Sequence, residues 1–361
     1  MIINIVIPGV GLTGGIQVVF TYAEYLKKHG HDVMFYTPLK AYDVKNSNNE
    51  LKNSIHVITN TIKRIWRYKI IKKYKTISYD VEVNPVLLIN DSTIRDADIT
   101  IATAWPTAYS VNKLVKNKGI KIYFVQGYEV WNNEILGKKS YTLDLHKITI
   151  SKWINDQLTN QLGGSGFPVV FDGIDLERFN ANKKINEDGS NFHFLMLYND
   201  LPNKGVSDGL VAFENVKKEY PNIKLSMFGM KTNPNLPPYV EYFNNPSKDE
   251  IKYLYESADV FIFPSLEEGW GLTPLEAMAS SCAVVGYNTG CMIDIGVDNE
   301  NVLLSLPGDV NMLKQNIRKL IENPILAQKI AQNGHITVQQ FSWEKCAYNF
   351  EQVLEEIFNA N

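Results

Sequence analysis

The chain has 361 residues, of which 45% are hydrophobic and 21% charged, and its formal charge is −3. This length is typical of about two domains, and the composition is that of a globular protein with ample core. The near balance of charges argues against a nucleic-acid-binding surface over the whole chain. No apolar run reaches the ~18 residues of a membrane span, and the three cysteines are too scattered for a disulfide framework. We therefore expect a cytoplasmic protein with reduced thiols.

Short apolar runs alternate with helical patterns along the first half of the chain. Strands are predicted at Ile2–Ile7, Val33–Tyr36, Val86–Ile89, Ile99–Ala102, Ile120–Val125, Lys147–Ile150 and Val169–Phe171. A helix is predicted over Ile16–Lys28, because basic residues and Gly30 mark its end. The polar, turn-rich stretch 180–191 then predicts a linker between two domains.

The same alternation restarts after this linker. Strands are predicted at Phe192–Leu197, Ile223–Phe228, Asp259–Phe263 and Ala283–Val285, and helices at Val206–Lys218, Lys248–Ser257, Thr273–Ala279 and from Asp309 onward. Strands that alternate with helices predict parallel sheets covered on both faces, an α/β class. Two such units in one chain predict a ligand cleft between them.

The segment Gly9–Gly15 contains a G-x-G-x-x-G between the first strand and the first helix, as a dinucleotide fingerprint does. Small residues there let backbone N–H groups approach a phosphate at the helix N-terminus. A nicotinamide site also needs an acidic residue at the end of the second strand, where this chain has Thr37 and Pro38. Three interpretations stay open: an anion-binding or substrate-facing loop, a tight turn, and a nicotinamide site.

Two carboxylates, Glu268 and Glu276, follow the buried strand predicted at Asp259–Phe263. The letters of Thr273–Glu276 fit a capping box with Pro at the first helical position, which would give Glu276 a structural role. A cap does not explain Gly269 and Gly271. Their backbone N–H groups would suit a diphosphate, with a carboxylate left to accept hydrogen bonds from sugar hydroxyls.

The stretch from Glu268 to Glu276 resembles the E-x7-E motif of the retaining family 4 glycosyltransferases, and the resemblance extends over nearly the whole chain. Other matching segments are Gly14-Gly15, Phe167–Asp175, Asn203-Lys204-Gly205, Phe228-Gly229 and Phe341-Ser342-Trp343. The resemblance implies the GT-B fold, with two Rossmann-like domains that face each other across a cleft. We expect an acceptor-side domain over 1–180, a nucleotide-sugar-binding domain over 181–342, and a helix over 343–361 that crosses back to the first domain.

The resemblance also implies roles for single residues. Glu276 would bind the ribose hydroxyls of the nucleotide, Glu268 would contact the donor sugar, and Lys204 would neutralise the diphosphate. Glu268 and Lys204 are therefore the expected catalytic residues, since a cation and preorganised donors stabilise charge on the leaving group. Backbone N–H groups that would hold sugar and phosphate belong to Gly269, Trp270, Gly271 and Leu272. Members of this family retain the anomeric configuration and need no bound metal or other cofactor.

The chain departs from the family pattern at two places. The family commonly has Arg five positions before its Lys, where this chain has Asn199, and Lys231 is the candidate that would supply the missing charge. The common first-domain histidine is absent from Ile99–Pro106. We count Gly14 and Gly15 with Asn199 and Lys231 as donor-binding candidates. A catalytically silent GT-B module that binds or stabilises a partner is the alternative, although the intact pair of carboxylates argues against it.

The stretch Tyr123–Trp131 is polar and aromatic directly after a predicted strand. It is similar to a segment of a bacterial subgroup that includes rhamnosyltransferases. Gln126, Tyr128 and Glu129 are therefore candidates for the acceptor side of the cleft, and an ordinary loop is the other interpretation.

The stretch Asp96-Ala97-Asp98 has the D-x-D spacing that holds a metal in the other glycosyltransferase fold. Here it leads into a strand at the amino-terminal end, away from the ligand edge of a parallel sheet. We therefore expect a solvated entry to this strand. No Cys/His spacing suggests zinc, and no metal is predicted.

The run Lys63–Lys75 holds seven basic residues and no acidic one. Its interleaved Ile, Trp and Tyr residues would suit a helix that lies on anionic lipid. A solvated helix face is equally open, and nucleic acid is the weakest interpretation.

Together these patterns predict a retaining, metal-independent glycosyltransferase of the hexosyl or deoxyhexosyl class. It would move a sugar from a nucleotide-diphosphate sugar to a saccharide or lipid-linked saccharide acceptor. The expected setting is the synthesis of bacterial surface polysaccharide or glycoconjugate. The enzyme would act in the cytoplasm or on the inner face of the cell membrane, and we expect no nucleic-acid partner.

Overall fold

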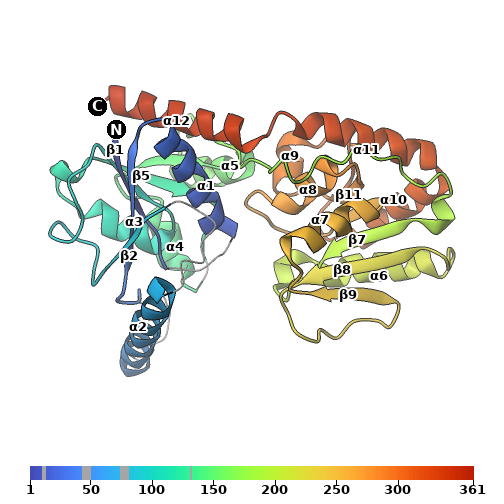
Figure 1. The fold of residues 1–361 in the computed structure, drawn as a ribbon, viewed down its shortest axis with the longest axis horizontal. Helices are drawn as coiled ribbons and strands as arrows, with labels where there is room; N and C mark the ends of the chain where they lie inside the picture. Colours follow the sequence, from blue (N-terminus) through green and yellow to red (C-terminus); the bar gives the residue numbers. More distant parts are fainter. Residues whose placement is uncertain (10–13, 43–49, 74–80, 131) are drawn as a thin grey trace. The chain divides into compact units, whose positions relative to one another are not determined.

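The computed structural model describes residues 1–9, 14–42, 50–73, 81–130 and 132–361. They form two compact units, coloured along the sequence in Figure 1. The first unit comprises Met1–Phe171 together with Trp343–Asn361, and the second comprises Asp172–Ser342. Each unit has its own sheet and its own buried core.

Residues 172–180, expected in the first domain, belong to the second unit. The backbone N–H of Ile174 donates to the carbonyl of Phe341 at 2.7 Å. The ring of Phe179 meets that of Tyr255 edge-on, with centroids 5.6 Å apart. These contacts tie the segment to the second unit before the polar linker begins.

The first unit is built on a parallel six-stranded sheet in the order β3-β2-β1-β4-β5-β6. Its strands are β1 (Ile2–Val6), β2 (Asp32–Pro38), β3 (Val83–Val86), β4 (Ile99–Ala102), β5 (Ile120–Val125) and β6 (His146–Thr149). Its helices are α1 (Gly14–Lys28), α2 (Glu50–Lys73), α3 (Trp105–Asn112), α4 (Glu134–Ser140), α5 (Lys152–Leu162) and α12 (Trp343–Asn359). Helix α12 packs on α1, where Phe350 stacks on Tyr22 at 4.8 Å.

The second unit repeats this topology in the order β12-β11-β10-β7-β8-β9, again with parallel pairing. Its strands are β7 (His193–Leu197), β8 (Lys224–Gly229), β9 (Val240–Asn244), β10 (Val260–Phe263), β11 (Ala283–Tyr287) and β12 (Leu303–Ser305). Its helices are α6 (Val206–Lys217), α7 (Lys248–Ser257), α8 (Leu272–Ala279), α9 (Cys291–Ile295), α10 (Val310–Glu322) and α11 (Pro324–Val338). The predicted α/β class with two Rossmann-like sheets is confirmed.

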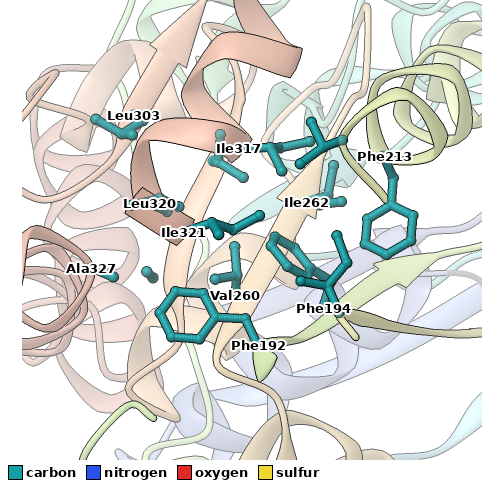
Figure 2. Packing of buried hydrophobic residues seen from close by; sticks show 14 of the residues in the cluster. Phe192, Phe194, Phe213, Val260, Ile262, Leu303, Ile317, Leu320, Ile321 and Ala327 are labelled. Atoms are coloured by element: carbon teal, nitrogen blue, oxygen red, sulfur yellow. The ribbon is translucent and has the colours of Figure 1, made fainter. Parts of the chain in front are cut away.

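A dense apolar core fixes the strands of the second unit. Phe194 of β7 and Phe213 of α6 meet edge-on, with centroids 5.3 Å apart, and Ile262 of β10 lies in the same cluster (Figure 2). Ile317 of α10 and Leu303 of β12 are fully buried there as well. The carboxyl ends of β7 and β10 are thereby held in a rigid frame.

In each sheet the order in which the chain adds strands reverses at one pair of neighbouring strands. In the first unit β1 and β4 are neighbours and the chain continues outward on either side, and in the second unit β7 and β10 have this position. Open α/β sheets bind ligands at the carboxyl edge beside such a pair of strands, so we expect a ligand site there.

Several predicted elements differ from the observed ones. β3 lies three residues earlier than predicted, at Val83–Val86, and the predicted strand Val169–Phe171 is reduced to one bridge between Val169 and Thr149. The edge strands β9 and β12 were not predicted. The three cysteines all lie in the described part of the chain, where they are buried and form no disulfide. Among the described residues, none of the helices has the length and apolar character needed to cross a membrane.

Candidate functional site

The turn that carries Lys204 depends on the glycine that follows it. Gly205 has φ +59°, and a Cβ added there would lie 1.9 Å from the carbonyl oxygen of Pro264. The N–H of Leu266 donates to the carbonyl of Asn203 at 2.8 Å. The loop after β7 is thus held against the loop after β10, the neighbouring strand of the sheet.

This close approach brings Lys204 and Glu268 together. The Nζ of Lys204 lies 2.6 Å from Oε1 of Glu268, and the two side chains are only 21% and 14% exposed. The hydroxyl of Ser265 donates to the same carboxylate oxygen at 3.2 Å. The two residues were predicted to have separate roles, and the structure joins them in one ion pair at the carboxyl edge of the second sheet.

The backbone after Glu268 is held by a second glycine. Gly290 has φ +55°, and its added Cβ would lie 2.3 Å from the carbonyl oxygen of Trp270 and 2.7 Å from Cβ of Glu268. The N–H of Cys291 donates to that carbonyl at 2.6 Å. The segment of predicted backbone donors, Gly269 to Leu272, therefore has a defined path into the amino end of α8. Sequence analysis did not identify Gly290.

The predicted capping box at Thr273–Glu276 is wrong. Helix α8 begins at Leu272, and its N-cap is Gly271, which has no side chain to cap the first turn. Glu276 lies further along the helix, and its Oε2 accepts a hydrogen bond from the hydroxyl of Tyr255 at 2.8 Å. The carboxylate is therefore bound by a side chain of α7 and not by the start of its own helix.

Burial raises the pKa of Glu276 to about 7, against the opposing effects of the Tyr255 hydroxyl and the positive charge of Arg178. Arg178 donates through Nη2 to the carbonyl of Lys248, and its guanidinium lies 4.6 Å over the ring of Phe179. No motif or spacing marked Tyr255 or Arg178 in the sequence. Their connection to Glu276 exists only after the chain has folded.

Asn199 and Lys231, the two residues considered in place of the family's Arg, both bind other groups of the protein. The Oδ1 of Asn199 accepts from the N–H of Leu201 at 2.9 Å and so stabilises its own turn. The Nζ of Lys231 lies 2.8 Å from Oδ1 of Asp200, and both side chains are about half exposed, at 45% and 56%. Lys231 would have to leave Asp200 to reach a diphosphate.

In the first unit the candidate glycines Gly14 and Gly15 start α1, and Gly15 lies beside Gln126. An added Cβ at Gly15 would be 3.1 Å from Oε1 of Gln126, whereas Gly14 has open space around it. The Nε2 of Gln126 donates to the carbonyl of Thr103, after β4, at 3.4 Å. Residues 10–13 of the glycine loop lie outside the described part of the chain. β2 ends at Pro38 without an acidic residue, so a nicotinamide site lacks its ribose ligand.

Glu129 and Tyr128 contact other residues of the first unit. The Oε2 of Glu129 accepts from the N–H of Trp105 at 2.7 Å, at the start of α3, and from the hydroxyl of Tyr123 at 2.9 Å. Burial raises the pKa of Glu129 to about 7. The ring of Tyr128 stacks on Tyr141 at 5.7 Å. A role for them on the acceptor side remains a prediction, and Trp131 lies outside the described residues.

We expect Glu129→Gln to change the pH dependence of stability. Because the folded-state pKa of Glu129 is raised, its contribution to stability is present at low pH and is lost as pH rises from about 4.5 to about 7. The variant should therefore gain stability relative to wild type between about pH 5 and about pH 8. Urea unfolding of both proteins at the two pH values measures the difference. A difference that does not change with pH would contradict the raised pKa.

The D-x-D stretch lies where it was predicted, at the amino ends of the strands. Asp98 accepts from the N–H of Ile2 at 2.6 Å, and Asp96 pairs with Nζ of Lys118 at 2.8 Å. Both carboxylates thus stabilise the edge of the sheet opposite to the glycine loop.

Within the described part of the chain, one group of side chains has the spacing of metal ligands: His31, Glu351 and Glu355. The Nε2 of His31 lies 2.7 Å from Glu351, and its Nδ1 lies 3.1 Å from the N-terminal ammonium of Met1. Both ring nitrogens already have partners. The group lies at the amino ends of β1 and β2, and it joins α12 to the sheet.

Comparisons with known proteins agree with this geometry. Residues 177–336 match the family model of the glycosyl transferases group 1. The chain is 28% identical to an uncharacterized glycosyltransferase of Methanocaldococcus jannaschii, over 95% of both chains. It is 24% identical to the capsular polysaccharide biosynthesis glycosyltransferase CapM of Staphylococcus aureus, over 74% of this chain and 77% of the relative.

Solved structures show the same fold over the full length. Sucrose-phosphate synthase from Thermosynechococcus elongatus superposes with a TM-score of 0.73 and 17% identity, and all of both chains is covered. HepE of Anabaena, in complex with UDP and glucose, gives a TM-score of 0.70 and 14% identity, with 99% of this chain and 100% of HepE covered. Residues 177–336, most of the second unit, therefore form a domain of the glycosyl transferases group 1 type, and the chain as a whole has the GT-B fold.

Proposed function

We propose that this enzyme transfers a sugar from a nucleotide-diphosphate sugar to a saccharide acceptor with retention of configuration and without a metal ion. The observation that carries the proposal is the Lys204–Glu268 ion pair at the carboxyl edge of the second sheet, 2.6 Å long and largely buried. Glu276 lies on the helix that begins just beyond it. A cation and the N–H groups of a glycine-rich backbone suit the diphosphate, and the two carboxylates suit the hydroxyls of the sugar and the ribose.

In the proposed reaction the bond between the sugar C1 and the diphosphate oxygen breaks, an acceptor hydroxyl oxygen forms the new glycosidic bond, and the hydroxyl proton passes to the departing diphosphate. The negative charge that develops on the diphosphate would be met by Lys204 and by the backbone N–H groups from Gly269 to Leu272. Glu268 would then exchange its ion pair for hydrogen bonds to the donor sugar. Glu276, positioned by the Tyr255 hydroxyl, would accept hydrogen bonds from the ribose.

We place the reaction in the synthesis of a surface polysaccharide or glycoconjugate, with a saccharide or lipid-linked saccharide as acceptor. The similarity to a capsular polysaccharide enzyme supports this setting. The basic run Lys63–Lys75 supports an acceptor that is presented at an anionic membrane. The proposed location is therefore the cytoplasm, at the inner face of the membrane.

Proton NMR of donor consumption tests the proposed reaction. The full chain is incubated with UDP- and GDP-sugars in the presence of a chelator, with water or simple saccharides as acceptors. We expect release of the nucleoside diphosphate and a first product with the anomeric configuration of the donor. An inverted first product would refute retention, and activity that returns only with added divalent metal would refute metal independence. Nucleotide binding without any turnover would favour the silent module.

A further inference from the structure

Helix α2 differs from the other long helices of the first unit because it extends away from the sheet (Figure 1). It spans Glu50–Lys73, 24 residues, or about 36 Å at the rise of an α-helix. Its sequence holds seven Lys or Arg residues and one acidic residue, although the whole chain carries a charge of −3. This concentration of positive charge needs a physical explanation.

One face of α2 is attached to the segment that follows β2. The hydroxyl oxygen of Thr61 accepts from the N–H of Ala41 at 3.0 Å, and Nη1 of Arg64 donates to the carbonyl of Pro38 at 3.1 Å. Burial lowers the pKa of Arg64, which is consistent with its inward position. These contacts fix which face of the helix points outward.

The outward face carries an apolar stripe: Ile55, Ile58, Ile62 and Trp66. Their exposed fractions are 57%, 60%, 60% and 69%. The spacings of three, four and four residues place all of them on one side of an α-helix. A solvated helix face would be polar at these positions, so the stripe indicates a surface that becomes covered.

From this stripe and the surrounding cations we infer that α2 is an interfacial anchor, with the stripe inserted into an anionic lipid bilayer. Trp66 and Ile62 would lie at the headgroup level, and the basic positions around them would meet lipid phosphates. Positions 69 and 73 continue the helical spacing from Trp66, while residues 74 and 75 lie outside the described part of the chain. This inference deepens the proposed function, on whose membrane-presented acceptor it rests.

The chemistry favours lipid over the other occupants. A second copy of α2 would bring two strongly basic helices together, and their like charges would repel. Nucleic acid would use the cations but would leave the isoleucines exposed, since phosphate contacts are polar. An anionic bilayer satisfies both the apolar stripe and the charge.

Vesicle co-sedimentation of the full chain tests the anchor. We expect binding to phosphatidylcholine vesicles that contain phosphatidylglycerol, weak binding to phosphatidylcholine alone, and partial binding that persists at about 1 M salt, where charges are screened beyond about 3 Å. Ile58→Ser and Ile62→Ser should each reduce partitioning by about tenfold. The matched control is the pair Ile325→Ser and Ile336→Ser, on α11, where exposure is 84% and 65%.

Tryptophan fluorescence supplies an independent readout. Vesicle binding should shift the emission of wild type to shorter wavelength, and Trp66→Phe should keep the binding but lose most of that shift. UDP titration of each variant should match wild type, so a failure of the proposed sugar transfer can be told apart from a failure of the anchor. Vesicle binding that vanishes at high salt and ignores the isoleucine variants would overturn insertion, as would no binding at all. A wild-type dimer that Ile62→Ser converts to a monomer would instead assign the stripe to a second copy.

Discussion

Replacing Lys204 by Ala should reduce turnover by about 10²–10³, the range for the loss of one preorganised donor to developing charge. Lys204 pairs with Glu268 after the neighbouring strands β7 and β10, with its Nζ 2.6 Å from the carboxylate and the two side chains only 21% and 14% exposed. Negative charge on the diphosphate grows as the bond to the sugar breaks, so the loss should appear mainly in the chemical step. Single-turnover rates at saturating donor measure it directly.

Lys231→Ala is the matched control for this experiment. It also removes a lysine paired with a carboxylate after the central strands of the second sheet, but its partner Asp200 is 56% exposed. If Lys231 stays with Asp200, its removal should leave the rate within about twofold of wild type, as for an exposed ion pair. If Lys231 replaces the family's Arg, its loss should approach that of Lys204, and the double variant should be non-additive. Full activity of Lys204→Ala would reject the proposed leaving-group role.

Replacing Glu276 by Ala should weaken nucleotide binding by roughly 1.5–3 kcal/mol, the range for hydrogen bonds to a charged group. This corresponds to about 10- to 150-fold in Kd. Calorimetry with the nucleoside diphosphate measures the loss. Glu276→Gln should lose less, because one acceptor oxygen remains, and Tyr255→Phe should lose less still, because it removes only the group that orients the carboxylate at 2.8 Å.

The raised pKa of Glu276 adds a pH test. With a pKa of about 7, the carboxyl is increasingly neutral below that pH and accepts hydrogen bonds less well. Nucleotide affinity should therefore fall with decreasing pH, by up to about tenfold per unit. Glu276→Gln should lack this pH dependence of affinity. The titration of the ligand's phosphate affects both proteins equally, so it cancels when the affinity of the variant is compared with that of wild type at each pH. Glu129→Gln, in the other unit, should keep the pH dependence. An identical pH profile for wild type and Glu276→Gln would contradict the assignment.

Much of the fold could be predicted because buried strands appear as short apolar runs. Ile99–Ala102 and Ile120–Val125 have the predicted bounds, as does the helix Lys248–Ser257. β9 escaped prediction because it is an edge strand whose residues are at most half-buried, and β12 because it has only three residues. Such strands exist through pairing with their neighbours, which a local pattern does not contain.

The site could be predicted only in part, for the same reason. Motif resemblance selected Lys204, Glu268 and Glu276, but not the 2.6 Å contact between the first two. That contact depends on the close approach of Gly205 to Pro264, two residues far apart in the sequence. The capping-box interpretation of Glu276 failed because α8 begins at Leu272 with Gly271 as its N-cap, and the carboxylate is bound by Tyr255 of another helix.

The most direct test of the donor site compares UDP with UMP, and GDP with GMP, by calorimetry on three proteins. Wild type should bind the diphosphate more tightly than the monophosphate. In Lys204→Ala this preference should largely disappear, because in the proposed site the lysine would face the phosphate that the monophosphate lacks. In Glu276→Ala both ligands should weaken by the same factor and the preference should persist, because the ribose is common to both. A preference that survives in Lys204→Ala would contradict the central claim.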